Sequence, residues 1–163
     1  MNLNEFDLEE LLLAAIKSEI ASKKLYTKIA KKTKNGILED KLLFLAKEEE
    51  KHQKYIEDIY TNHYPEKKLK IPDNTPVPLP KIEISEEIPT SKLLQMAMNA
   101  EENAKEFYTH LSNRFENGTK IHNTLLYFAD MEQGHYKILQ MEKESMQRFE
   151  EADEYWPMIH VGP

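Results

Sequence analysis

Apolar residues recur at alternating steps of three and four positions along four long stretches of the chain. This spacing places them on one face of an α-helix, where they can pack against a core. Stretches of this length and period are typical of the long helices of a bundle. The pattern therefore predicts four helices, over residues 4–34, 37–64, 89–116 and 119–152.

Asparagine and glycine residues mark the ends of the predicted helices. Asn4 is a suitable N-cap for the first helix, because acidic residues follow it in the positively polarised first turn. Asn35 with Gly36, and Asn117 with Gly118, can adopt the left-handed conformation that ends a helix. Both turns are short, so the two helices that each turn joins should run antiparallel.

A proline-rich stretch separates the second helix from the third. Residues 65–88 have little helical periodicity and contain Pro65, Pro72, Pro76, Pro78 and Pro80. About 24 residues of extended chain can return along a helix of about 40 Å. The second and third helices should therefore be parallel. We expect two helical hairpins, 4–64 and 89–152, joined by this long crossover. The C-terminal tail, 153–163, is rich in aromatic and apolar residues and should pack on the bundle or on a partner.

The composition supports a single all-α domain. A chain of 163 residues with 40% hydrophobic residues can bury one core but would be cramped as two domains. Four glycines are too few for a turn-rich all-β protein. We therefore expect residues 1–163 to form one domain.

Charge and cysteine content exclude several classes of function. The net charge is −7 and the basic residues are spread along the chain, which argues against nucleic-acid binding. The absence of Cys excludes disulfides, thiolate metal sites and a rubredoxin-type iron centre within this chain. No basic leader precedes an apolar run, and no stretch reaches the roughly 20 apolar residues of a membrane span. These features predict a soluble cytoplasmic protein.

Six polar residues interrupt the apolar stripes. They occupy positions that should face the core, and they are Glu19, Glu49, His52, Glu101, Glu132 and His135. An isolated carboxylate costs several kcal/mol to bury, so four of them need positive charge or protonation. The alternative to a bound cation is a set of protonated or hydrogen-bonded buried groups.

An internal repeat relates these polar residues to one another. The first and third helices correspond at an offset of 82 residues, and the second and fourth at an offset of 83. The equivalent pairs are Glu19 and Glu101, Tyr26 and Tyr108, Ala46 and Ala129, Glu49 and Glu132, and His52 and His135. A short Glu and His motif is weak evidence alone, but its repetition with a partner glutamate on each preceding helix favours a metal site.

Charge balance indicates two divalent cations. Glu and His three residues apart on a helix point to the same side, so the second and fourth helices can each offer both groups to one ion. Four carboxylates carry about −4, which two divalent ions would neutralise. Ligands rich in carboxylate suit iron or manganese better than a structural zinc ion.

These residues resemble those of the rubrerythrin branch of the ferritin-like superfamily. The resemblance extends over about residues 4–150 and implies a ferritin-like four-helix bundle with a dinuclear non-haem iron centre. It also implies that Glu19 and Glu101 are terminal or bridging ligands and that the two Glu and His pairs complete the centre. Tyr26 and Tyr108 would hydrogen-bond to ligand carboxylates, the alternative being that both are core-packing tyrosines.

Two departures from the family pattern affect the expected function. Rubrerythrins proper carry a rubredoxin domain with four Cys ligands, so here electrons must come from a separate carrier such as a rubredoxin. They also use a further glutamate, whereas this chain has Ala104 three residues after Glu101, and the adjacent Glu102 should point away from the centre. A more symmetric site like that of bacterioferritin is the alternative.

Several functions are compatible with this site. The leading hypothesis is a di-iron oxidoreductase that reduces hydrogen peroxide, or dioxygen, to water and acts in oxidative stress. The others are ferritin-like oxidation and storage of iron, a manganese catalase-like activity, and a non-catalytic bundle stabilised by its metals. The long crossover favours a homodimer, with or without exchanged helices, over a hollow shell.

Overall fold

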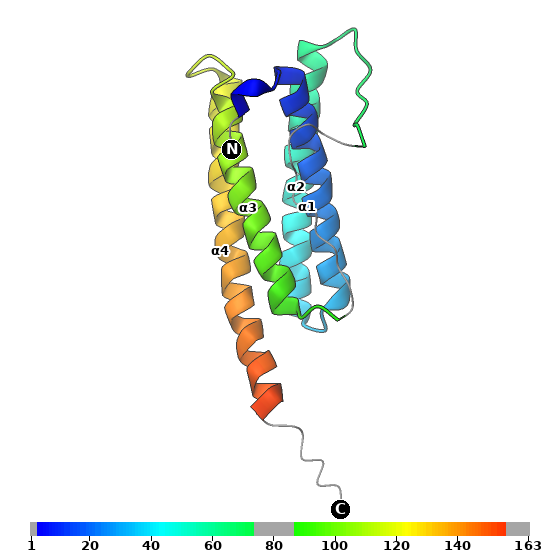
Figure 1. The fold of residues 1–163 in the computed structure, drawn as a ribbon, viewed down its shortest axis with the longest axis vertical. Helices are drawn as coiled ribbons and strands as arrows, with labels where there is room; N and C mark the ends of the chain where they lie inside the picture. Colours follow the sequence, from blue (N-terminus) through cyan, green and yellow to red (C-terminus); the bar gives the residue numbers. More distant parts are fainter. Residues whose placement is uncertain (1–2, 74–86, 156–163) are drawn as a thin grey trace, which may run out of the picture.

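The computed structural model describes residues 3–73 and 87–155, with burial described to residue 151. Within these ranges the chain forms four α-helices, one short 3-10 helix and no strand. The elements are η1 (Leu3–Glu5), α1 (Leu8–Lys32), α2 (Gly36–His63), α3 (Thr90–Ser112) and α4 (Lys120–Tyr155) (Figure 1). The predicted all-α class and the four predicted helices are confirmed.

The helices pack as two hairpins in one bundle. α1 packs mainly on α2, and α3 packs mainly on α4. Figure 1 shows that α2 and α3 run in the same direction, as the long crossover predicted. Most of that crossover, residues 74–86, lies outside the described residues, as does the tail from residue 156. α4 is longer than predicted, and its last turns extend beyond the other three helices (Figure 1).

The first helix begins later than predicted, because Asp7 caps it and Asn4 does not. The Asp7 side chain accepts a hydrogen bond from the Glu10 backbone N–H at 2.8 Å, and the Glu10 side chain accepts one from the Asp7 N–H at 3.0 Å. This reciprocal capping box satisfies two backbone donors at once. Asn4 instead lies in the short 3-10 helix that precedes the cap.

The first turn also differs from the prediction, because neither Asn35 nor Gly36 is left-handed. Asn35 has a φ of −93° and caps the start of α2, where its side chain accepts from the N–H groups of Ile37 and Leu38. Capping satisfies donors that a helix start leaves unpaired, which explains why Asn35 begins a helix here. In the second turn Gly118 does have a positive φ, of 83°, although α3 has already ended at Ser112.

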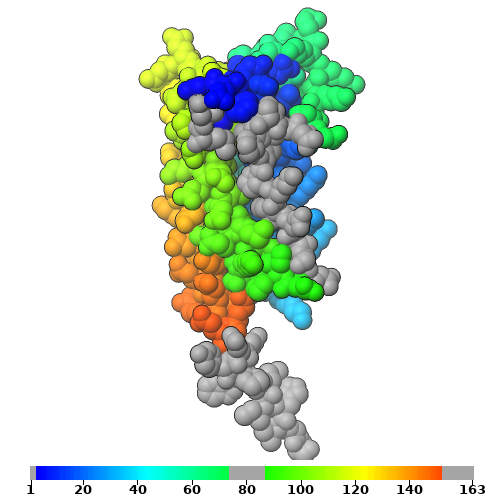
Figure 2. Space-filling view, in the orientation of Figure 1, coloured from blue at the N-terminus to red at the C-terminus, as the bar shows by residue number. Residues whose placement is uncertain are grey.

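Two apolar clusters fill the two ends of the bundle. One contains Leu11, Leu12, Ile56, Leu111 and Leu125, and the other contains Leu25, Ile29, Leu38, Leu94 and Leu139. Each helix contributes to both clusters, so the residues between them on every helix face a middle layer. The six polar residues of the stripes occupy this layer. Figure 2 shows α3 and α4 side by side on one face of the bundle, with the last turns of α4 beyond it.

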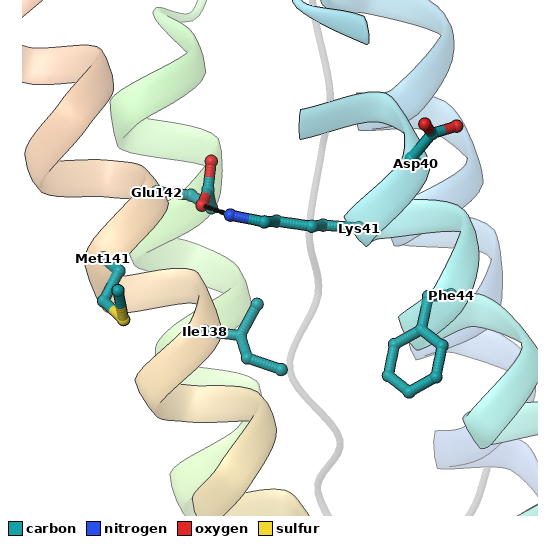
Figure 3. A pocket seen from close by; sticks show the side chains of 6 residues that line it. All are labelled: Asp40, Lys41, Phe44, Ile138, Met141 and Glu142. Carbon is teal, nitrogen blue, oxygen red and sulfur yellow. Dashed lines mark hydrogen bonds and ion pairs between the residues drawn. The ribbon is translucent and has the colours of Figure 1, made fainter. Parts of the chain in front are cut away.

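A groove separates α2 from α4 near one end of the bundle. It has a volume of about 440 Å³, and Phe44, Ile138 and Met141 form its apolar lining (Figure 3). An ion pair between Lys41 and Glu142 spans it and links the two hairpins. Because the Lys41 side chain is 43% exposed, solvent screens this pair and limits its contribution to stability. None of the described helices combines the length and the apolar character that crossing a membrane requires.

Candidate metal centre

All four helices contribute to one polar cluster in the middle of the bundle. Glu19 comes from α1 and Glu101 from α3, while α2 and α4 each supply a Glu and a His separated by one helical turn. None of the six residues is more than 4% exposed. The structure therefore brings all six predicted residues together: Glu19, Glu49, His52, Glu101, Glu132 and His135.

The six residues form two overlapping groups of potential ligands. In each group, one side-chain N or O atom per residue lies within 4.8 Å of the others. The first group is Glu19, Glu49, His52 and Glu132, and the second is Glu49, Glu101, Glu132 and His135. Glu49 and Glu132 belong to both groups. Each group also has one carboxylate and one imidazole of its own, so the cluster has the approximate twofold symmetry of the repeat.

Both histidines direct Nδ1 toward the carboxylates. His52 Nδ1 lies 2.9 Å from Glu132 Oε1 and 3.8 Å from Glu19 Oε2. His135 Nδ1 lies 3.0 Å from Glu49 Oε1 and 3.5 Å from Glu101 Oε2. Each imidazole therefore contacts a glutamate of the opposite hairpin. Because an imidazole nitrogen binds a metal through its lone pair, Nδ1 is the atom of each histidine placed to do so.

Buried polar atoms without hydrogen-bond partners test whether the cluster suits metal ions. Among the described residues, the two outer glutamates each have one such buried oxygen, Glu19 Oε2 and Glu101 Oε2, whereas Glu49 Oε1 and Glu132 Oε1 each face a histidine Nδ1, at 3.0 and 2.9 Å. A buried acceptor without a partner costs about 1–3 kcal/mol, and more when it is charged. A cation bound among these oxygens would remove that cost. The residues present therefore fit two divalent ions with mixed oxygen and nitrogen ligands.

The outer two glutamates favour their protonated form when no cation is bound. Burial raises the pKa of Glu19 well above its usual value, and the negative charge of Glu49 raises it further. Burial also raises the pKa of Glu101, with Glu132 as the next contributor. Both carboxylates therefore need a nearby positive charge in order to ionise at neutral pH.

The two histidines and the two shared glutamates behave in the opposite way. Burial lowers the pKa of His52, but the adjacent carboxylates of Glu132 and Glu49 outweigh it and raise the pKa to about 9. For His135, hydrogen bonds to glutamates likewise outweigh burial and raise the pKa to about 12. Burial opposes ionisation of Glu49 and Glu132, yet the adjacent histidines lower the pKa of both. Without a cation, four protons would thus balance the charge that two divalent ions could balance.

The two repeat-related tyrosines differ in their hydrogen bonding. The Tyr108 hydroxyl on α3 donates to a carboxylate oxygen of Glu19 on α1, which holds that side chain from outside the cluster. Burial raises the pKa of Tyr108 well above its usual value, with Glu19 as the next contributor, so the hydroxyl keeps its proton. Tyr26 is equally buried, but its hydroxyl has no hydrogen-bond partner in the described part of the chain.

One aromatic contact at the cluster was missing from the sequence-based prediction. The ring of Phe128 stacks on His52 with a centroid distance of 4.2 Å and an interplanar angle of 30°. Phe128 lies one turn before Glu132 on the same apolar stripe, and this position in the sequence could have indicated that its ring lies next to the cluster. Its equivalent in the repeat is Leu45, so the repeat did not draw attention to the position.

The other histidines with described positions lie outside the cluster. His63 and His110 are exposed, and His122 is buried beside Asn123, where their side chains are 3.3 Å apart. His160 lies outside the described residues. Glu102 is exposed, as expected, and Ala104 is partly buried. Neither belongs to the groups that could hold an ion.

Comparisons with known proteins agree with this site. The sequence matches the rubrerythrin family over residues 10–89 and 92–158. The fold matches the structure of a hypothetical protein from Pyrococcus furiosus with a TM-score of 0.77 and 34% sequence identity, covering 91% of this chain and 95% of that one. A search of curated proteins finds no match. Because the family match includes both hairpins and all six residues of the cluster, the chain belongs to the rubrerythrin family.

Proposed function

We propose that this protein is a dinuclear iron oxidoreductase that reduces hydrogen peroxide to water. One observation carries the proposal: two four-residue groups of buried ligands share two carboxylates in the middle of the bundle. Shared carboxylates hold two ions close together, as an oxidant that accepts two electrons at one place requires. Membership of the rubrerythrin family supports the same chemistry.

Each residue of the cluster then has a specific role. Glu49 and Glu132 would be shared by the two ions, because both belong to each group. Glu19 and His52 would complete the ligands of one ion, and Glu101 and His135 would complete those of the other. Iron is the metal that we propose, since carboxylate-rich ligands with one imidazole per ion suit iron, with manganese as the alternative.

The side chains supply geometry and charge rather than electrons. Reduction of one hydrogen peroxide to two water molecules consumes two electrons and two protons, and the bound iron pair would supply the electrons. Tyr108 holds Glu19 by its hydrogen bond, which limits rearrangement of that ligand. Phe128 covers one face of His52 and fixes the plane of its ring. The apolar clusters at both ends of the bundle keep bulk water away from the layer between them.

An external donor must restore the electrons, one at a time, after each turnover. The chain contains no Cys and therefore no rubredoxin-type centre of its own. A small electron carrier such as a rubredoxin would fill this role. We also expect a small assembly, a homodimer, rather than a storage shell.

Anaerobic loading with Fe(II) followed by peroxide tests the proposal. Peroxide should disappear much faster than with the same concentration of free Fe(II), with one peroxide consumed per two irons oxidised. The Glu49→Gln variant should lose this advantage, because it removes a carboxylate shared by both ions. Glu48→Gln, at the preceding position and outside the cluster, should retain it. Consumption no faster than that of free iron would refute the proposal, and binding of many irons per chain would favour iron storage instead.

A further inference from the structure

A small pocket reaches the polar cluster from the outside, between α3 and α4. Its volume is about 190 Å³, which is enough for several water-sized molecules. Glu101 and Glu132, both buried members of the cluster, form part of its lining. The other lining residues are Glu102, Lys105, Gln133 and Tyr136, and Glu102 is exposed to solvent. The pocket therefore connects exposed side chains with two of the proposed ligands.

A side-chain hydrogen bond joins the two helices at this pocket. Lys105 Nζ on α3 donates to Gln133 Oε1 on α4 at a distance of 2.7 Å. Both side chains are partly exposed, so rotation about their own bonds can break and re-form the contact without moving a helix.

The repeat provides an internal comparison for this pocket. Lys23 and Glu50 are the equivalents of Lys105 and Gln133 in the first hairpin, and they form an ion pair at 3.3 Å. The residue after the first glutamate differs between the hairpins. In the first hairpin Ile20 is partly buried against the apolar core, whereas in the second the equivalent Glu102 is exposed and lines the pocket. The two flanks of the metal site are thus chemically distinct.

We propose that the pocket between α3 and α4 is the access port through which hydrogen peroxide reaches the metal pair. This inference rests on the proposed function. At the rim, the positive charge of Lys105 is balanced by the negative charge of Glu102, so no net charge favours an ion. The ammonium group of Lys105 can donate hydrogen bonds to a small, polar, uncharged molecule, and the amide of Gln133 can both donate and accept them. Hydrogen peroxide has these properties at neutral pH.

The absence of cysteine from the chain permits a selective test. A Gln133→Cys variant can be labelled with a bulky aromatic methanethiosulfonate, and Glu50→Cys is the matched control on the first hairpin. Both variants are loaded anaerobically with Fe(II). Nitric oxide, a small uncharged molecule that binds ferrous iron, is then mixed in, and its binding is followed by visible absorbance in a stopped-flow instrument. Iron content per chain is measured before and after labelling.

We expect the label at position 133 to slow nitric oxide binding about tenfold, because access then requires a structural rearrangement. The label at position 50 should change the rate by less than about twofold. Reductive removal of the label should restore the original rate, which separates blocking from misfolding. Equal rates with and without the label at position 133, or equal slowing by both labels, would overturn the port.

Failure of the port and failure of the proposed function give different results. Nitric oxide binding that is slowed only by the label at position 133, together with no peroxide reduction, would support the port and refute the peroxidase activity. Rapid peroxide reduction that neither label affects would support the peroxidase activity and refute the port. A chain that takes up no iron would overturn both.

Discussion

Tyr26 and Tyr108 are equivalent in the repeat, yet only Tyr108 hydrogen-bonds to a carboxylate of the cluster. Removing the Tyr108 hydroxyl in Tyr108→Phe leaves Glu19 without the partner that holds it in place. Loss of such a supporting hydrogen bond lowers metal affinity about 10- to 100-fold. We therefore expect Tyr108→Phe to weaken metal binding, measured by competition with a coloured chelator.

Tyr26→Phe is the matched control for this substitution. Its hydroxyl has no partner among the described residues, so its removal should leave metal affinity within about twofold of the original. Equal weakening by both substitutions would show that the hydrogen bond to Glu19 is not the cause.

Individual site residues were predictable to the extent that they follow helical periodicity. The six polar residues stood at core positions of the stripes, and the repeat paired them, so their meeting in one buried cluster followed from the sequence. The stacking of Phe128 on His52 and the lack of a partner for Tyr26 did not follow. Both depend on side-chain rotamers and on distances between helices, which tertiary packing sets and periodicity does not.

At the scale of single elements, Gly134 is an unusual residue in the middle of α4. Beyond the surrounding backbone of α4 itself, a methyl group added at this position would meet no atom within 4 Å. The glycine therefore does not allow a close approach to another part of the described chain. Glycine is about 1 kcal/mol less favourable than alanine within a helix. Gly134→Ala should therefore raise the free energy of unfolding by about 1 kcal/mol, measured by urea denaturation.

Gly118→Ala provides the contrast, because Gly118 has a φ of 83° that alanine rarely adopts. We expect this change to lower the free energy of unfolding by about 1 kcal/mol. A loss of stability in Gly134→Ala, or none in Gly118→Ala, would contradict this assignment of the two glycines.

Helix number and type were more predictable than helix ends. The four stripes identified α1 to α4 because their apolar period persists over many turns. The ends depend on competition between nearby capping residues. Asp7 outcompetes Asn4 because Glu10 completes a capping box, and Asn35 begins a helix rather than ending one. Asparagine can cap the start of a helix or follow its end, so its presence alone does not show which end it marks.

At the scale of the whole molecule, the buried charges make stability depend on pH. The pKa of His52 is raised from 6.5 to about 9, so the folded protein binds more protons than the unfolded chain between these values. Stability from this group is therefore present below pH 6.5 and is lost as the pH rises through about 9. His135, Glu19 and Glu101, whose pKa values are also raised, act in the same direction.

We predict that the metal-free protein, prepared with a chelator, melts at a lower temperature at pH 9 than at pH 6.5. Each shifted group contributes at most about 1.4 kcal/mol per pH unit to this fall. Bound cations replace the protons, so the metal-loaded protein should show a smaller fall. Melting curves of both forms across this range test the prediction, and parallel curves for the two forms would contradict it.

The topology was predictable because the crossover is long enough to return along the bundle and so makes α2 and α3 parallel. The pocket between α3 and α4 was not predictable. Its lining combines two helices whose relative rotation sets which side chains meet, and the sequence alone suggested only that Glu102 points away from the centre. Surface features that join two elements depend on packing geometry, which a pattern within one element does not contain.

Metal stoichiometry tests the central claim, that two ions bind among six buried residues, most directly. We predict two ions per chain in an anaerobic Fe(II) titration followed by elemental analysis. Glu132→Ala should lose both ions, because Glu132 belongs to both groups, whereas Glu19→Ala should retain the ion held by the other group. Circular dichroism should show that both variants keep their helices. Fewer than two ions in the unmodified chain, or two ions in Glu132→Ala, would contradict the account.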